Sequence, residues 1–358
     1  MRSARPTALT AAALLLLSAC SGGGESVDTG TGGDAGASGS GGAGGGGGTL
    51  VAAISAQPDQ LDPHASSAYP TFQVLENVYD TLVVPAAEDL TMQPSLASGW
   101  TTSEDGLTWT FALREGVTFH DGSTFDAADV VYSYDRIVGE DLPNAYRFAT
   151  VADVVAQDPQ TVVVTLTQPT PHLLSLLGSY KGMAILPEGA ADSTDLATSA
   201  VGTGPFTLEG SDPSGTTLAA NPDYWGEAPS IDGVEFRYLT EPAAALTALQ
   251  SGEVQWTDNV PPQQIAALQG DDAVELATTP SVDYWYLSMN FARPPFDDPA
   301  VRRAVATAVD RAAVTEAARF EAAQPNQTAI PRAASSPTTT RRSPPTPRPR
   351  ASCSPTPA

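Results

Sequence analysis

Cysteine and histidine are scarce in this chain of 358 residues. The two cysteines, Cys20 and Cys353, lie outside the part that can fold, so neither a disulfide framework nor a Cys-x-x-Cys motif is expected. His64, His120 and His172 lack the spacing of metal ligands. The sequence therefore predicts no zinc site and no bound cofactor.

Basic residues are also few. Lysine and arginine total 17 against 41 aspartates and glutamates, which gives a formal net charge of -24 and a pI near 4.2. Binding to phosphate backbones needs a basic surface, so nucleic acid is excluded as a partner. The acidic residues are spread along the chain rather than blocked, which is typical of a soluble surface.

The first apolar run, Ala8 to Leu17, follows Arg2 and Arg5 and is too short to span a bilayer. It leads into Leu17-Ser18-Ala19-Cys20, which resembles the lipobox of bacterial lipoproteins. That resemblance implies that residues 1–20 are a signal peptide and that the Cys20 thiol is lipidated. The protein would then be anchored to the outer face of the cell membrane. The alternative is an ordinary cleaved signal with a chance cysteine.

Two segments have compositions that cannot bury apolar surface. Residues 21–48 are almost all Gly, Ser, Ala, Thr and Asp, which predicts a disordered tether with an r.m.s. span of roughly 30 Å. Residues 332–358 are rich in Pro, Thr and Arg, which also predicts a disordered tail. Between these segments, residues 49–331 carry the periodic patterns of a folded domain.

Residues 106–136 are the most informative part of that domain. Trp109, Phe111 and Leu113 alternate with smaller residues, which predicts a strand with one buried face. After two turns, Asp126 and Asp129 form an acidic capping box at the start of a helix. Nothing in the stretch indicates catalysis.

Similar patterns predict further elements on both sides of this stretch. Residues 49–54 read as a first strand, and residues 69–84 as a helix. Residues 245–251 read as a helix that ends at Gly252. Asp298 and Pro299 predict the start of another helix, as N-cap and first-turn proline. Alternation of strands and helices indicates an α/β protein.

Several runs of the chain, in order, resemble one family. They are LDPHASSAYPTFQVLENVYDTLV, PSLASGW, DGLTWTFALREGVTFHDGSTFDAADVVYSYDR, VGTGPF, NPDYW and PFDD. The chain is similar to the extracytoplasmic solute-binding proteins of ABC importers, in the large branch that includes oligopeptide-, dipeptide- and nickel-binding proteins. Any one run is weak evidence, but their shared order from residue 50 to 331 is specific.

The resemblance implies a two-lobed periplasmic-binding-protein-like α/β fold, type II, of the large cluster with an inserted subdomain. The first lobe would comprise residues 50–69 and 200–284, and the subdomain residues 70–199. The second lobe would start at residue 285 and stop incomplete at 331. Two explanations of the tail are open, a natural Pro/Thr-rich stalk and a shifted reading frame. Because the second lobe is interrupted midway rather than completed before the tail, the shifted reading frame is favoured.

The family also implies a function and partners. The protein would be a monomer that captures peptides, or a related small solute, and delivers them to the permease and ATPase subunits of an importer. Site residues are suggested by position only: Tyr284, Trp285 and Tyr286 on a strand crossing between the lobes, with Tyr69 and Asn290 as weaker candidates.

Enzymatic alternatives have little support in the sequence. His120-Asp121 would be an acid–base pair in a secreted Ser/His/Asp hydrolase, but it lies in a turn-forming context. The turn at residues 202–205 lacks the third glycine of a nucleotide loop, and Pro205 removes an amide. We expect no catalytic residue. A binding-defective truncated homologue and a surface adhesion protein remain open alternatives.

Overall fold

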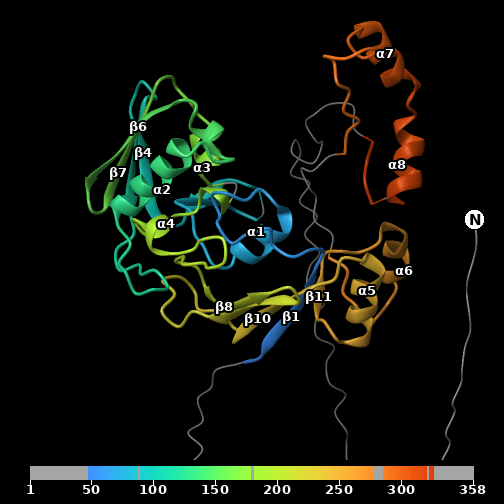
Figure 1. Cartoon of the computed structure of the whole chain (residues 1–358), viewed down its shortest axis with the longest axis horizontal. Coiled ribbons are helices and arrows are strands. Elements are labelled where there is room, and N and C mark those ends of the chain that lie inside the picture. Colours follow the sequence, from blue (N-terminus) through green and yellow to red (C-terminus); the bar gives the residue numbers. More distant parts are fainter. Residues whose placement is uncertain (1–46, 88, 179–180, 278–284, 321, 326–358) are drawn as a thin grey trace, which may run out of the picture. The chain divides into compact units, whose positions relative to one another are not determined.

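The computed structural model describes residues 47–87, 89–178, 181–277, 285–320 and 322–325 (Figure 1). Strands and helices alternate over much of this range, as predicted for an α/β protein. No helix in the described ranges is long and apolar enough to cross a membrane.

The larger sheet takes its strands from both sequence segments of the predicted first lobe, the one before and the one after the inserted subdomain. Its strands are β1 (Thr49–Ile54), β8 (Phe206–Asp212), β9 (Gly215–Ala220), β10 (Gly233–Tyr238) and β11 (Trp256–Thr257). Their order is β11-β1-β10-β9-β8, and β1 runs parallel to both of its neighbours. The strand predicted at residues 49–54 is therefore confirmed, and it lies inside the sheet.

A second sheet contains the stretch at residues 106–136. Its strands are β4 (Ala97–Thr102), β5 (Thr108–Leu113), β6 (Val151–Asp158) and β7 (Thr161–Leu166), in the order β4-β5-β7-β6, and all pairs are antiparallel. A small sheet pairs β2 (Val83–Pro85) with β3 (Met92–Pro94).

The remaining elements are helices. The α-helices are α1 (Tyr69–Leu75), α2 (Ala127–Gly139), α3 (Leu173–Gly178), α4 (Ala190–Ser193), α5 (Pro242–Ser251), α6 (Ile265–Leu268), α7 (Pro299–Ala308) and α8 (Arg311–Arg319). The 3-10 turns are η1 (Ala145–Phe148), η2 (Lys181–Met183) and η3 (Pro262–Gln264).

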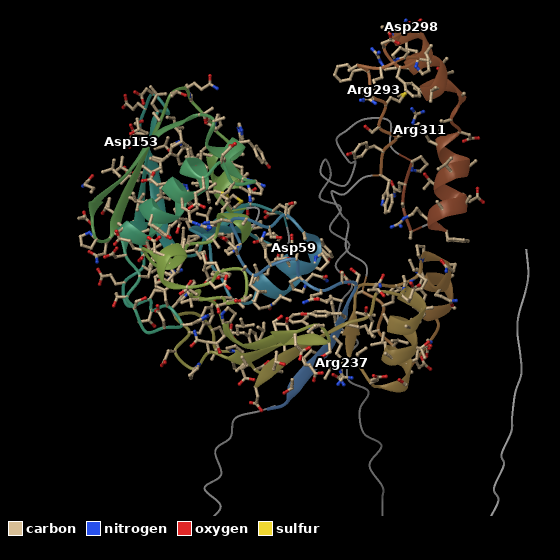
Figure 2. The ribbon with its side chains drawn as sticks, viewed as in Figure 1. Asp59, Asp153, Arg237, Arg293, Asp298 and Arg311 are labelled. Carbon is tan, nitrogen blue, oxygen red and sulfur yellow. The ribbon has the colours of Figure 1, made fainter. Side chains whose placement is uncertain are left out.

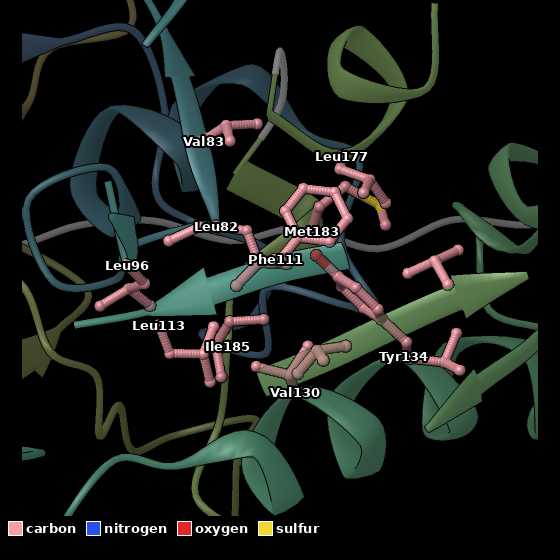
Figure 3. Packing of buried hydrophobic residues seen from close by; sticks show 14 of the residues in the cluster. Leu82, Val83, Leu96, Phe111, Leu113, Val130, Tyr134, Leu177, Met183 and Ile185 are labelled. Carbon is pink, nitrogen blue, oxygen red and sulfur yellow. The ribbon is translucent and has the colours of Figure 1, made fainter. Parts of the chain in front are cut away.

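The predicted capping box opens α2. The Asp126 side chain accepts a hydrogen bond from the Ala128 amide, and the Asp129 side chain accepts one from the Asp126 amide. Val130 and Tyr134 of this helix pack against Phe111 and other residues of the second sheet (Figure 3). This core fixes the subdomain and carries no exposed reactive group.

Two further predicted helix boundaries agree with the structure. Gly252 ends α5 in the left-handed region with φ of 78°. Pro299 occupies the first turn of α7, and the Asp298 side chain accepts a hydrogen bond from the Ala300 amide.

The helix predicted for residues 69–84 is wrong beyond residue 75. The Asn77 side chain donates to the carbonyls of Gln73 and Val74 and so satisfies the end of the helix. The carbonyl of Val78 then accepts a hydrogen bond from the Gly204 amide, at 2.9 Å. Because a distant segment pairs with this backbone, the chain leaves the helix while its apolar residues stay buried.

Candidate functional site

The carboxyl ends of three parallel strands form the edge where we place the site. β1 ends at Ile54, β10 at Tyr238 and β11 at Thr257, and their parallel registers bring these ends to the same edge. The chain passes from β10 through α5 to β11, on the far side of β1. In open α/β sheets, ligands bind outside the carboxyl ends of strands where neighbouring connections diverge.

Three polar side chains meet at this edge. The Tyr69 hydroxyl donates to Oδ2 of Asp258 at 2.7 Å, and the Gln73 amide donates to the same oxygen at 2.8 Å. Tyr69 and Gln73 are four residues apart in α1 and therefore share one face of that helix. Asp258 directly follows β11. The cluster joins α1 to the strand edge, and we call it the Tyr69–Asp258 cluster.

The loop between β1 and α1 is held by Asp59, which Figure 2 shows beside α1. Its Oδ1 accepts hydrogen bonds from the hydroxyls of Ser66, at 2.6 Å, and Thr71, at 2.7 Å. Burial opposes ionisation here, but these hydrogen bonds outweigh it and lower the pKa of Asp59 below its ordinary value. An ionised Asp59 therefore fixes the start of α1, and with it Tyr69.

Of the residues predicted to contact a ligand, only Tyr69 lies in this cluster. The residue is 66% exposed. Tyr284 and the lipidation candidate Cys20 lie outside the described residues. The ligand contacts themselves remain predictions.

The strand predicted through Trp285 and Tyr286 is wrong for the described residues 285–290, which join none of the sheets. Trp285 and Tyr286 are 83% and 76% exposed, and Asn290 is also exposed. The alternation of these aromatic side chains predicts a strand with two different faces. A strand also needs a neighbouring strand whose backbone pairs with its N–H and C=O groups, and alternation alone does not supply one. The Arg319 guanidinium lies 5.1 Å from the centroid of the Trp285 ring.

His120 is engaged by the turn at residues 202–204 rather than by a catalytic partner. Its Nε2 donates to the Gly204 carbonyl at 3.0 Å, and its Nδ1 accepts from the Gly202 amide at 3.3 Å. Burial lowers the pKa of His120, so the neutral ring is favoured. With both nitrogens bound to backbone, the ring has no lone pair left to act as a general base in this geometry.

A buried ion pair near the site was not predicted. Arg136 of α2 donates to both carboxylate oxygens of Asp62, at 2.6 and 3.1 Å, and to Nδ1 of His64 at 3.1 Å. The other ring nitrogen of His64 donates to the Ala184 carbonyl at 2.8 Å. This group ties the loop after β1 to α2. Its only sequence signal is a lone basic residue in α2.

Asp258 and Gln73 were also missed. Asp258 lies 189 residues from Tyr69, after a strand of two residues, and Gln73 is an ordinary helix residue. The signal that could have found Asp258 is an acidic residue at the end of a strand, before the Val260-Pro261-Pro262 turn.

Comparison with known proteins gives concordant results. The family model "Bacterial extracellular solute-binding proteins, family 5 Middle" matches residues 91–350. The matched range extends beyond Pro331 and includes residues 332–350, which belong to the Pro-, Thr- and Arg-rich tail. Glutathione-binding protein GsiB of Salmonella paratyphi A is 32% identical over 287 residues, which are 79% of this chain and 56% of that protein.

Two solved structures share the fold. The periplasmic binding protein DppA from Helicobacter pylori, in complex with the peptide STSA, aligns with a TM-score of 0.68 and 26% identity, over 76% of this chain and 59% of that one. MoaA from A. tumefaciens R10, in complex with mannopinic acid, aligns with a TM-score of 0.66 and 29% identity, over 76% and 57%. The predicted type II periplasmic-binding-protein fold is confirmed.

The chain spans a little over half the length of these relatives, 56% of GsiB and 59% of DppA. The family model nevertheless covers most of the chain, and the carboxyl-edge geometry is that of a ligand-binding α/β sheet. The chain belongs to the bacterial extracellular solute-binding proteins of family 5.

Proposed function

We propose that this chain captures a small solute, with peptides as the expected class, and delivers it to the permease and ATPase of an ABC importer. The observation that carries the proposal is the Tyr69–Asp258 cluster at the carboxyl edge of β1, β10 and β11, in a chain of this family. The activity is binding without catalysis, since His120 is held by the backbone.

The relatives support peptides over other solutes. GsiB is named for glutathione, a tripeptide, and DppA was solved with the peptide STSA. MoaA was solved with mannopinic acid, so related scaffolds also take other solutes. Binding would involve hinge closure, which a ligand drives only by binding the closed state more tightly than the open one.

The proposed organisation follows the sequence prediction. Residues 50–69 and 200–284 form the first lobe and residues 70–199 the inserted subdomain. In support, the larger sheet draws its strands from residues 49–54 and 206–257, and the second sheet from residues 97–166. Tyr284, at the end of the first lobe, and Trp285, Tyr286 and Asn290, at the start of the second, would add contacts to the solute.

Ligand binding to the full chain tests the proposal. A ligand at 100 times its Kd stabilises the native state by about 2.7 kcal/mol, which raises Tm by roughly 5–10 °C. We expect this shift with at least one short peptide in a scan that also includes opines and free amino acids. Tyr69→Phe should weaken binding, whereas Tyr146→Phe, at another exposed tyrosine, should not. No shift with any solute would refute the proposal.

We further propose that Cys20 anchors a monomeric protein to the outer face of the cell membrane. The lipobox-like Leu17-Ser18-Ala19-Cys20 motif supports this. In cells, the wild type should partition into detergent, and Cys20→Ala should leave the membrane fraction. Equal partitioning of the two proteins would refute the anchor without affecting the solute-binding proposal.

A further inference from the structure

We infer that Asp59 is a positioning residue for solute binding, because it holds the Tyr69 hydroxyl in place at the carboxyl edge of the larger sheet. The inference rests on the proposed function, in which Tyr69 contacts the solute. Asp59 would not touch the solute itself. It would act through the hydrogen bonds that join the loop after β1 to the first turn of α1.

The first turn of α1 is not capped by its own N-cap residue. That residue is Ala68, whose side chain offers no acceptor to the free amides at the start of the helix. Pro70 follows Tyr69 in this turn and has no amide hydrogen to donate. The position of the helix start, and of Tyr69 within it, therefore depends on groups outside the helix backbone.

Asp59 supplies this support through two hydroxyl groups. Ser66 Oγ accepts a hydrogen bond from the Ala68 amide at 3.1 Å and donates one to Oδ1 of Asp59 at 2.6 Å. Thr71 Oγ1 donates to the same oxygen at 2.7 Å and accepts from the Asp59 amide at 3.1 Å. One carboxylate thus joins residues on both sides of Tyr69.

Both hydroxyl groups depend strongly on this acceptor because water does not reach them. Ser66 and Thr71 are fully buried. Removal of the carboxylate would leave two buried donors without their acceptor, which is unfavourable unless the start of the helix shifts to give them another one. Tyr69 lies between these two residues in sequence, so its hydroxyl would move with them.

The middle of the same loop is fixed independently of Asp59. Both carboxylate oxygens of Asp62 accept hydrogen bonds from Arg136, at 2.6 and 3.1 Å. The Leu61 amide donates to the Ala197 carbonyl at 3.0 Å. Loss of the Asp59 carboxylate should therefore displace the start of α1 while the loop and the core stay in place.

A double-mutant cycle on the full chain tests the inference, with affinities measured by calorimetry. The probes are glutathione and the peptide STSA, the ligands named for two relatives. Asp59→Ala should weaken binding about 10-fold, the effect of one lost hydrogen bond to the solute. In the Tyr69→Phe background the same change should weaken binding by less than about 3-fold, because the hydroxyl that Asp59 positions is already absent.

Two matched variants separate positioning from a general loss of stability. Asp59→Asn keeps an acceptor oxygen and should bind within about 3-fold of the wild type. The control is Asp105→Ala, in the turn between β4 and β5 of the second sheet. Asp105 accepts similar hydrogen bonds, from the Ser103 hydroxyl at 2.6 Å and the Leu107 amide at 3.0 Å. Its loss should leave the affinity unchanged.

Amide hydrogen exchange of the solute-free chain adds a second measurement. Amides of α1 should exchange about 10-fold faster in Asp59→Ala than in the wild type. Unchanged exchange, additive losses in the cycle, or an equal loss of affinity in Asp105→Ala would each overturn the inference while the solute-binding proposal stands. If neither probe binds, the first solute to raise Tm in the wider scan replaces them, and no shift with any solute would overturn both proposals.

Discussion

The ion pair between Arg136 and Asp62 should be among the most costly interactions to break in this protein. Both side chains are over nine-tenths buried, at 8% and 7% exposure, and the contact is bidentate. Arg136→Met keeps much of the apolar stem but leaves the Asp62 carboxylate buried without its counter-charge. Removing one partner of a buried pair costs about 3–5 kcal/mol. For a domain of this size, that loss lowers Tm by roughly 6–20 °C.

Two matched variants make the measurement decisive. Arg237→Met breaks a pair whose side chains are 34% and 37% exposed, and such a pair is worth about 0–1 kcal/mol. The double variant Arg136→Met with Asp62→Asn removes the orphaned charge and should regain much of the loss. Thermal melting of the four proteins at pH 7 provides the comparison. If Arg136→Met melts like Arg237→Met, or if the double variant melts no higher than Arg136→Met, the reasoning fails.

Four further predictions concern pH, close packing, capping and folding order. Burial lowers the pKa of His64 to about 4, so the unfolded chain binds this proton more tightly than the folded chain does. The contribution of His64 to the free energy of unfolding therefore falls by roughly 3 kcal/mol as the pH drops from 6.5 to 4. Burial raises the pKa of Asp129 to about 6, so the folded chain binds this proton more tightly than the unfolded chain does. The contribution of Asp129 to the free energy of unfolding therefore falls as the pH rises from 4 to 6. In urea titrations across this window, His64→Gln should therefore remove the first slope and Asp129→Asn the second; unchanged slopes would contradict the assignment. A Cβ on Gly202 would overlap the Val78 carbonyl oxygen, so Gly202→Ala should cost about 3 kcal/mol or more, whereas Gly210→Ala, in open space, should cost under about 1 kcal/mol by denaturant midpoint. Asp126→Ala removes the cap of α2 and should cost about 1 kcal/mol by the same assay; no change would show that the cap is dispensable. The fourth, on folding order, follows from the position of β1 in the larger sheet.

Local patterns predicted elements well where neighbouring residues decide the structure. The strand at Trp109 and Phe111, the capping box of Asp126 and Asp129, and the stop at Gly252 all depend on residues within one or two turns. These contacts are local, so period and capping chemistry were sufficient to find them.

Prediction failed where a distant segment determines the outcome. The helix expected to continue to residue 84 ends at Leu75 because Gly204, far along the chain, pairs with the Val78 carbonyl. Asp258, the partner of Tyr69 in the Tyr69–Asp258 cluster, was missed for the same reason, and the role of Tyr69 as a ligand contact stays a prediction. Tyr69 could be placed by its position after the Leu61-Asp62-Pro63 turn, but no local pattern brings Asp258 to it across 189 residues.

The position of β1 has a consequence for the order of folding. β1 lies between β10 and β11, and 184 residues separate Gly48 from the Asp232 side chain that accepts its amide hydrogen. The larger sheet therefore cannot close until the chain has been synthesised through β11, which ends at Thr257. In the β4-β5-β7-β6 sheet, in contrast, the most distant strand pair joins Thr108 to Thr165, a separation of 165 − 108 = 57 residues. Since more distant contacts carry a larger loop-closure cost, this sheet should form first. Pulsed hydrogen exchange during refolding should protect amides of β5 and β7 before those of β1, and the reverse order would show that early long-range pairing drives the fold.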